Sequence, residues 1–154
     1  MKIFRTYCDG ACDRVKEVAA LSFIVVEDNV VRWEHTHTFP SKSANEAEMR
    51  SIIASLDILK NFGGADGDRV FVYTNLKTIP DAFDKGWIQK WLDNDWKNSD
   101  GKNVRHKELW SAIIAHSKRV NLEVRYAQKD EMLYFSRLKK RVRKAVRSFE
   151  QVLQ

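Results

Sequence analysis

Three side chains of this sequence have the types and positions needed to hold a metal ion. Asp9, in the segment RTYCDGAC, is predicted to end a buried strand, and Glu48 lies in the first turn of a predicted helix. Asn75 ends the apolar segment RVFVYTN, which is typical of a strand covered on both faces. If the first and fourth strands are neighbours, the three residues meet at one end of the sheet. Carboxylates that close repel each other and stay ionised only beside a cation, most simply Mg²⁺. The sequence therefore predicts a metal site with Asp9 and Glu48 as ligands.

The elements that position these residues follow from the periods of the apolar residues. Ser43 and Glu46 form a predicted capping box, so a helix is expected to begin near Ala44. The segments predicted as strands are residues 2–8, 18–27, 30–39, 69–75 and 122–128. Helices are predicted over residues 44–60, 76–83, 87–96 and 103–120, followed by a C-terminal helix. The expected fold is α/β, with a mixed five-stranded sheet of three antiparallel and then two parallel strands, flanked by helices.

Length and composition restrict the class of protein. A chain of 154 residues, 44% hydrophobic and 31% charged, is expected to form one domain over residues 1–154. No apolar window has the length of a membrane span, and no secretory signal pattern follows Met1. Cys8 and Cys12 lie too close together to join distant elements. We therefore expect an intracellular protein that contacts no membrane.

The positive charge is concentrated near the C-terminus. The net charge is +6, and lysines and arginines crowd a helix expected over residues 134–152. Apolar residues at helical spacing, Leu138 and Val142 among them, predict that this helix docks by one stripe and presents its basic face to solvent. Such a face suits nucleic acid, with a protein partner or plain solvation as the alternatives.

These segments together resemble the type 1 ribonucleases H. The resemblance rests on DGA at residues 9–11, ANEAEM at 44–49, VYTN at 72–75 and the long segment GWIQKWLDNDWKNSDGKNVRHKELWSAI at 86–113. It implies the RNase H-like fold and an activity in which two Mg²⁺ (or Mn²⁺) ions cleave the RNA strand of an RNA–DNA hybrid. It also implies that residues 86–113 form a helix and a basic protrusion that grip the DNA strand.

The resemblance assigns roles to particular residues. Asp9 and Glu48 match the first two catalytic carboxylates, Asn75 takes the place of the third, and Asn45 matches an asparagine that contacts the hybrid. The protrusion residues expected to bind nucleic acid are Trp87, Lys90, Trp91, Lys97 and Lys102. The tryptophans have a second interpretation, since at helical spacing some of them belong to the core.

The sequence departs from the family pattern at several positions. Where the family has its third catalytic Asp this chain has Asn75, and the best register for the fourth Asp places Lys139 there. An amide is a weaker Mg²⁺ ligand than a carboxylate, and an ammonium group repels the ion. Asp130 or Glu131 is an alternative fourth carboxylate, although an exposed polar turn is the favoured interpretation. The histidine that assists product release in many relatives is also absent.

Three functions from different classes remain open on the sequence alone. The first is a domain that binds RNA–DNA hybrid or other nucleic acid with lost or strongly reduced nuclease activity, in which Lys139 contacts a phosphate and no metal is required. The second is an active Mg²⁺-dependent hybrid endonuclease, in which Asn75 is an engineered replacement of Asp. The third is a structural module that docks a protein through the basic C-terminal helix.

Overall fold

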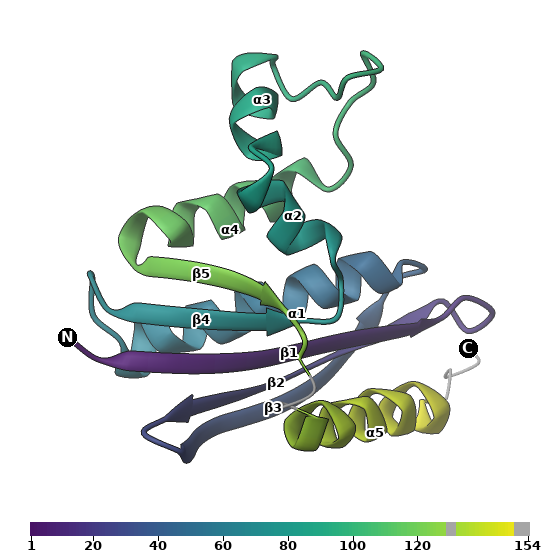
Figure 1. Ribbon diagram of the computed structural model, residues 1–154. Helices are drawn as coiled ribbons and strands as arrows, with labels where there is room; N and C mark the ends of the chain where they lie inside the picture. The colour runs from purple at the N-terminus through teal and green to yellow at the C-terminus, as the bar shows by residue number, and fades with distance from the viewer. Residues whose placement is uncertain (129–131, 150–154) are drawn as a thin grey trace.

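The computed structural model describes residues 1–128 and 132–149 of the chain. Its five strands form one mixed sheet in the order β3-β2-β1-β4-β5 (Figure 1). The strands are β1 Ile3–Asp13, β2 Val18–Glu27, β3 Val30–Pro40, β4 Arg69–Thr74 and β5 Asn121–Tyr126. The helices are α1 Ala44–Ile58, the π-helix η1 Leu59–Gly63, α2 Thr78–Asp84, α3 Trp87–Asp93, α4 Lys107–Arg119 and α5 Met132–Ser148. Strands β1 to β3 pair antiparallel, and β4 and β5 are parallel to β1, so the predicted α/β fold is confirmed.

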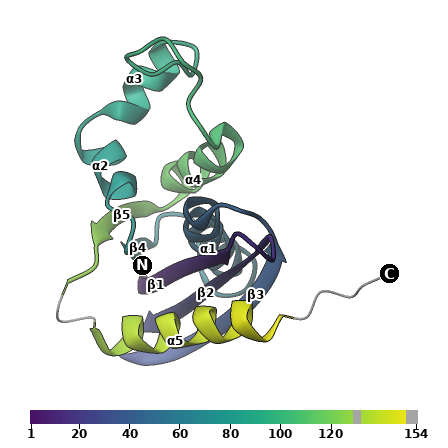
Figure 2. The ribbon, with the colours of Figure 1, turned by 90° about the vertical axis from the view of Figure 1, so that its right-hand side faces the viewer.

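Helices cover both faces of the sheet. Helix α1 packs on β1, β2 and β4 and is joined by α4, while α5 packs on the other face, against β1, β2 and β3 (Figure 2). Side chains alternate between the two faces along each strand. In β1, for example, Phe4 and Cys8 belong to the cluster under α1, and Tyr7 belongs to the cluster under α5. Strand β2 is buried from Val18 to Val26 because helices lie over both of its faces.

Strand β1 is longer than predicted, which corrects the position of Asp9. The parallel ladder between β1 and β4 ends at Cys8 and Thr74, but the antiparallel ladder with β2 continues to Asp13. Asp9 therefore lies inside β1 rather than at its end, at the first position beyond the partner strand β4. The physical reason is that β2 supplies hydrogen-bond partners for five more residues of β1, from Asp9 to Asp13.

Helix α1 begins where the capping residues predict. The Ser43 hydroxyl accepts a hydrogen bond from the Glu46 backbone N–H at 3.1 Å, and the Glu46 carboxylate accepts one from the Ser41 hydroxyl at 2.8 Å. Because the helix begins at Ala44, Glu48 lies in its second turn and not in its first as predicted. A side chain does not fit at Gly10, since a Cβ there would lie 2.4 Å from the Glu48 backbone nitrogen. This glycine lets β1 approach α1 closely beside Asp9.

Helices α2 and α3 and the loop that leads to α4 project from the sheet as the protrusion, residues 77–106 (Figure 1). Helix α3 ends at Asp93, because Asp95 and Trp96 adopt positive φ angles of 51° and 58°. The loop is closed by an isolated bridge between Lys97 and Asn103. These turns explain why the predicted helices over residues 87–96 and 103–120 are shorter in the structure.

Helix α5 is fixed on the sheet by a few large apolar side chains. Phe135, Leu138 and Val142 are buried against it. At the C-terminal end of the helix, Lys16 Nζ donates to the carbonyl oxygens of Val146 at 3.3 Å and Arg147 at 3.0 Å. No helix within residues 1–128 and 132–149 is long and apolar enough to cross a bilayer.

Candidate functional site

Asp9 and Glu48 are both buried at the edge where β4 ends beside β1. Glu48 Oε1 accepts two hydrogen bonds, one from Thr74 Oγ1 at 2.5 Å and one from the Asn75 backbone N–H at 3.0 Å. Asp9 Oδ1 accepts one from the Gly10 backbone N–H at 2.9 Å. The end of β4 therefore fixes the carboxylate of Glu48, and the backbone of β1 fixes that of Asp9.

Burial opposes the negative charge on both carboxylates. It raises the pKa of Glu48 to about 8, and the nearby charge of Asp9 adds to this effect. Burial also raises the pKa of Asp9, against the opposing influence of the Gly10 N–H, the Asn75 side chain and the positive charge of Lys139. The pair consequently resists carrying two full negative charges at neutral pH.

Asn75 follows directly after β4 and brings an amide to the carboxylate pair. Its side chain lies near enough to Asp9 to lower the pKa of that carboxyl group. Its Nδ2 atom is buried, yet it completes no hydrogen bond with any residue that the structure describes. A buried donor without a partner is costly and is a common feature of binding sites. Asn75 thus presents an unsatisfied donor where the resemblance implies a third carboxylate.

Lys139 reaches the same site from α5. Its ammonium group is close enough to Asp9 to favour the ionised carboxylate. It lines a pocket of about 220 Å³ together with Asn75, Tyr126 and Phe135. The structure therefore brings together Asp9, Glu48, Asn75 and Lys139, and we call these four residues the carboxylate site.

The residues predicted to bind nucleic acid through the protrusion lie next to this site. Exposed Asn45, on the first turn of α1, lines a pocket of about 280 Å³ with Trp87, Trp91 and Trp110. Trp87 and Trp91 also line a neighbouring hollow with Lys90 and Lys97. The first two turns of α1 thus contribute Asn45 to the protrusion pocket and Glu48 to the carboxylate site.

The tryptophans and lysines of the protrusion differ in how free they are to contact a ligand. Trp110 is buried and meets Trp91 edge-on, with ring centroids 5.1 Å apart, so this part of the cluster is structural. Lys90 is exposed on α3. Lys97 Nζ donates to the Asn103 side chain. Lys102 is exposed and lines neither hollow, but its backbone N–H donates at 3.0 Å to the side chain of Asn98, which lines both.

Sequence reasoning misses some residues that shape the site. Thr74 holds Glu48, and its only signal in the sequence is a hydroxyl residue immediately before Asn75 in the segment VYTN. Arg105 and His106 line the protrusion pocket from the loop before α4, and no spacing in the sequence indicates this. Asp130 and Glu131, the alternative fourth carboxylates, lie outside the described residues.

The sheet order, the helix on each face and the acidic pair at the end of the central parallel strands define the class of RNase H-like proteins. A family profile described as RNase H matches residues 1–129, and the chain belongs to this family. The ribonuclease H of Chlorobaculum parvum is 29% identical over 113 residues, which cover 73% of each chain.

Solved structures show the same fold at lower sequence identity. The foamy viral protease-reverse transcriptase in complex with double-stranded DNA superposes with a TM-score of 0.75 at 11% identity, covering 96% of this chain and 95% of that one. LC11-RNase H1 in complex with RNA/DNA hybrid superposes with a TM-score of 0.67 at 19% identity, covering 93% of this chain and 99% of that one.

The resemblance implies a pair of divalent ions held by four carboxylates, and the donor set can be tested against this. Within residues 1–128 and 132–149, no three His, Cys, Asp or Glu side chains come together as ligands for one ion. Asn75 and Lys139 line one pocket at this edge instead, and the positive charge of Lys139 opposes the rise in the pKa of Asp9. A fixed ammonium group repels a second cation at short range. The described residues therefore do not fit a pair of divalent ions, and the ligand roles of Asp9 and Glu48 stay predictions.

Proposed function

We propose that this protein binds RNA–DNA hybrid along the edge formed by the carboxylate site and the protrusion, and that its nuclease activity is lost or strongly reduced. One observation carries the proposal: Asn75 and Lys139 line one pocket beside Asp9, so an amide and an ammonium group stand at the two positions where the resemblance implies carboxylates. A site built in this way favours a phosphate group of the hybrid over a second metal ion.

Family membership and the form of the protrusion support the choice of hybrid as ligand. The relatives are named ribonuclease H, and LC11-RNase H1 is known in complex with RNA/DNA hybrid. In this chain, Trp87 and Trp91 offer partly exposed rings for stacking or sugar contacts. Lys90, Lys97 and Lys102 add positive charge for the phosphates, and Asn45 adds an amide near the carboxylate site.

The reduced activity is expected because cleavage in such sites needs chemistry that two metal ions supply. They activate a water molecule and stabilise the leaving oxygen in an in-line attack on the phosphodiester. Here only two carboxylates converge among the described residues, and Lys139 supplies positive charge without being able to activate water in this way. Mg²⁺ or Mn²⁺ is then expected to be dispensable for binding.

The test follows binding and cleavage of one labelled RNA–DNA hybrid in the same samples while Mg²⁺ or Mn²⁺ is titrated. We expect salt-sensitive binding that needs no metal, with no strand cleavage by the wild-type protein. Metal-dependent cleavage at a rate typical of an enzyme would overturn the loss of activity and leave hybrid binding in place. A protein that neither binds nor cleaves the hybrid would overturn the whole proposal.

A further inference from the structure

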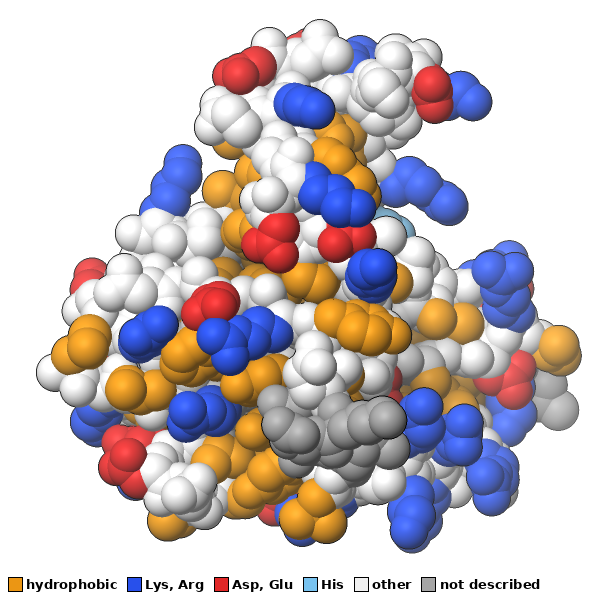
Figure 3. Space-filling view, viewed as in Figure 1, with side chains coloured by type: hydrophobic (Ala, Val, Ile, Leu, Met, Phe, Trp, Pro, Cys, Tyr) orange, Lys and Arg blue, Asp and Glu red, His pale blue; other side chains and the backbone are white. Residues whose placement is uncertain are grey.

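The basic residues of α5 fall into two groups with different surroundings. Arg137 and Arg141 both pair with Glu34 of β3, at 3.4 and 2.9 Å. The remaining five have no carboxylate within 4 Å among the residues that the structure describes, and they are Lys139, Lys140, Arg143, Lys144 and Arg147. In Figure 3, lysine and arginine side chains gather at the lower right, where α5 lies in Figure 1. Glu34 of the sheet thus compensates the charges of Arg137 and Arg141, whereas the other five basic side chains of α5 have no such partner within the described part of the chain.

Three of the unpaired residues form a line along the helix. Lys139, Arg143 and Arg147 are four residues apart and all exposed, so they follow one another along one side of α5 over about 12 Å. We call them the α5 stripe. Leu138 and Val142 are buried beneath the helix, so the orientation of the stripe relative to the sheet is fixed.

The two ends of the stripe meet different parts of the molecule. At one end Lys139 lines the pocket that it shares with Asn75 in the carboxylate site. At the other end Lys16, from the turn between β1 and β2, donates to the last carbonyl oxygens of α5. The stripe therefore continues the carboxylate site away from the protrusion, which lies on the opposite side of the sheet edge (Figures 1 and 2).

The surface of the stripe has the chemistry of a phosphate track rather than of a protein interface. The exposed large apolar side chains of α5 and its flank, as far as the structure describes them, are Leu133 and Phe149 near its two ends. Between them the stripe offers no apolar anchor of the kind on which protein–protein affinity depends. Unpaired cations in a row instead match a chain of phosphates, from which they release counterions.

We propose that the α5 stripe binds the sugar-phosphate backbone of a single-stranded extension that leaves the hybrid at the carboxylate site. This inference rests on the proposed function, because it takes the hybrid to lie across the protrusion and the carboxylate site. A duplex is stiff over this length, whereas a flexible single strand can bend to follow the row of cations on α5.

The experiment compares a blunt RNA–DNA hybrid with four hybrids that each carry a single-stranded extension of about six nucleotides at one of the four strand ends. The affinity ratio between extended and blunt hybrid is measured at low salt. We expect one of the four extensions to raise affinity about tenfold and to steepen the salt dependence.

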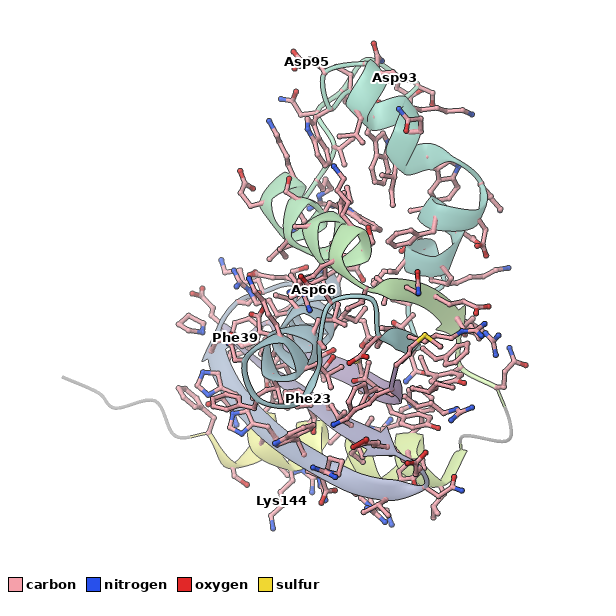
Figure 4. All side chains as sticks on the ribbon, turned by 90° about the vertical axis from the view of Figure 1, so that its left-hand side faces the viewer. Phe23, Phe39, Asp66, Asp93, Asp95 and Lys144 are labelled. Atoms are coloured by element: carbon pink, nitrogen blue, oxygen red, sulfur yellow. The ribbon has the colours of Figure 1, made fainter. Side chains whose placement is uncertain are left out.

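Two double variants of the same helix test whether the stripe causes this gain. Arg143→Glu with Arg147→Glu alters positions about 40° and 80° round the helix from Lys139, and is expected to abolish the ratio. Lys140→Glu with Lys144→Glu makes the same charge change about 100° and 140° away, and is expected to keep it. Lys144 lies at the end of the molecule opposite Asp93 and Asp95 of the protrusion (Figure 4). Because each variant is compared with itself, the ratio of its affinities for extended and blunt hybrid reduces the general effect of its net charge on binding.

The outcomes separate this inference from the proposed function. If the wild-type protein binds blunt hybrid and no extension adds affinity, the inference is overturned and hybrid binding stands. The same holds if the Arg143 and Arg147 variant keeps the wild-type ratio, which returns α5 to the protein-partner alternative. If blunt hybrid does not bind at all, the proposed function itself fails.

Discussion

The carboxylate site and the protrusion share α1 but are built on opposite physical principles. In the carboxylate site, two buried carboxylates lie beside the exposed Lys139, and Glu48 is fixed by Thr74 and the Asn75 backbone. In the protrusion, partly exposed rings and lysines surround two adjoining hollows on short helices. A single change of charge alters the first region decisively, because a buried charge has few neighbours to compensate it. Several aromatic and basic side chains line the hollows of the protrusion, so the affinity for nucleic acid is expected to be shared among many contacts.

On the proposed function, binding and cleavage depend on different parts of this fold. An amide or an ammonium group can replace a carboxylate in the buried site without touching Trp87, Trp91 or the lysines of the protrusion. Each region should therefore respond to mutation in its own way, with cleavage depending on the charges of the carboxylate site and binding on the side chains of the protrusion.

The largest effect is expected from returning carboxylates to the carboxylate site. Asn75→Asp with Lys139→Asp should raise Mg²⁺- or Mn²⁺-dependent cleavage of a hybrid by about a hundredfold or more. The same variant should gain thermal stability when Mg²⁺ is added, because metal relieves the repulsion between the added acids. Adding Glu48→Gln should remove both gains. A double variant that shows neither cleavage nor metal-dependent stabilisation would contradict the assignment of these positions.

The next effect concerns the protrusion alone. Trp87→Ala should weaken hybrid binding by about tenfold, since an aromatic contact with nucleic acid contributes about 1–3 kcal/mol. Fluorescence anisotropy with labelled hybrid measures the change. Phe62→Ala, which removes an exposed ring from η1 on another part of the surface, is the matched control and should bind normally. Equal losses in both variants would show that the protrusion has no special role.

A smaller effect is expected from Lys139 alone. Lys139→Asp should weaken binding a few-fold at low salt and reduce the slope of log K against log salt by about one, as expected for one lost phosphate contact. Lys140→Asp, one residue along α5, carries the same charge change away from Asp9. Binding by the Lys139 variant that is unchanged or tighter would show that this ammonium group contacts no phosphate of the hybrid.

The smallest effect on binding, and a distinct one on stability, is expected from Glu48→Gln. Burial raises the pKa of Glu48 from 4.5 to about 8, so the folded protein holds a proton that the unfolded chain releases within this range. The free energy of unfolding should therefore fall as the pH rises from about 4.5 to 8. Gln keeps an acceptor for Thr74 but cannot ionise, so the variant should lose most of this slope. Chemical denaturation at several pH values measures it, and an equal slope in both proteins would show that Glu48 is not its source.

The sequence predicts the framework of this fold well, because its signals are local and periodic. The capping residue Ser43 places the start of α1, and the apolar run from Val70 to Thr74 places a strand covered on both faces. The predicted end of β1 is wrong because Asp9-Gly10 has the composition of a turn. Gly10 is needed instead for close packing against α1, a contact between segments far apart in the chain.

The site is predictable only in part, for a related reason. Asp9, Glu48 and Asn75 are expected to meet because strand order brings their positions together. Their burial, which governs the charge they carry, depends on both packed faces of the sheet and has no local signal. The approach of Lys139 to Asp9 depends on how α5 lies on the sheet, and only the family resemblance indicates it.

Gly10 has a consequence for the history of such a protein. Any side chain at this position would collide with the backbone of α1, so selection for folding alone retains the close approach of β1 and α1. The geometry of the acidic pair is therefore inherited whether or not the site cuts. On the proposed function, the changes at Asn75 and Lys139, and not a new fold, separate this protein from a nuclease.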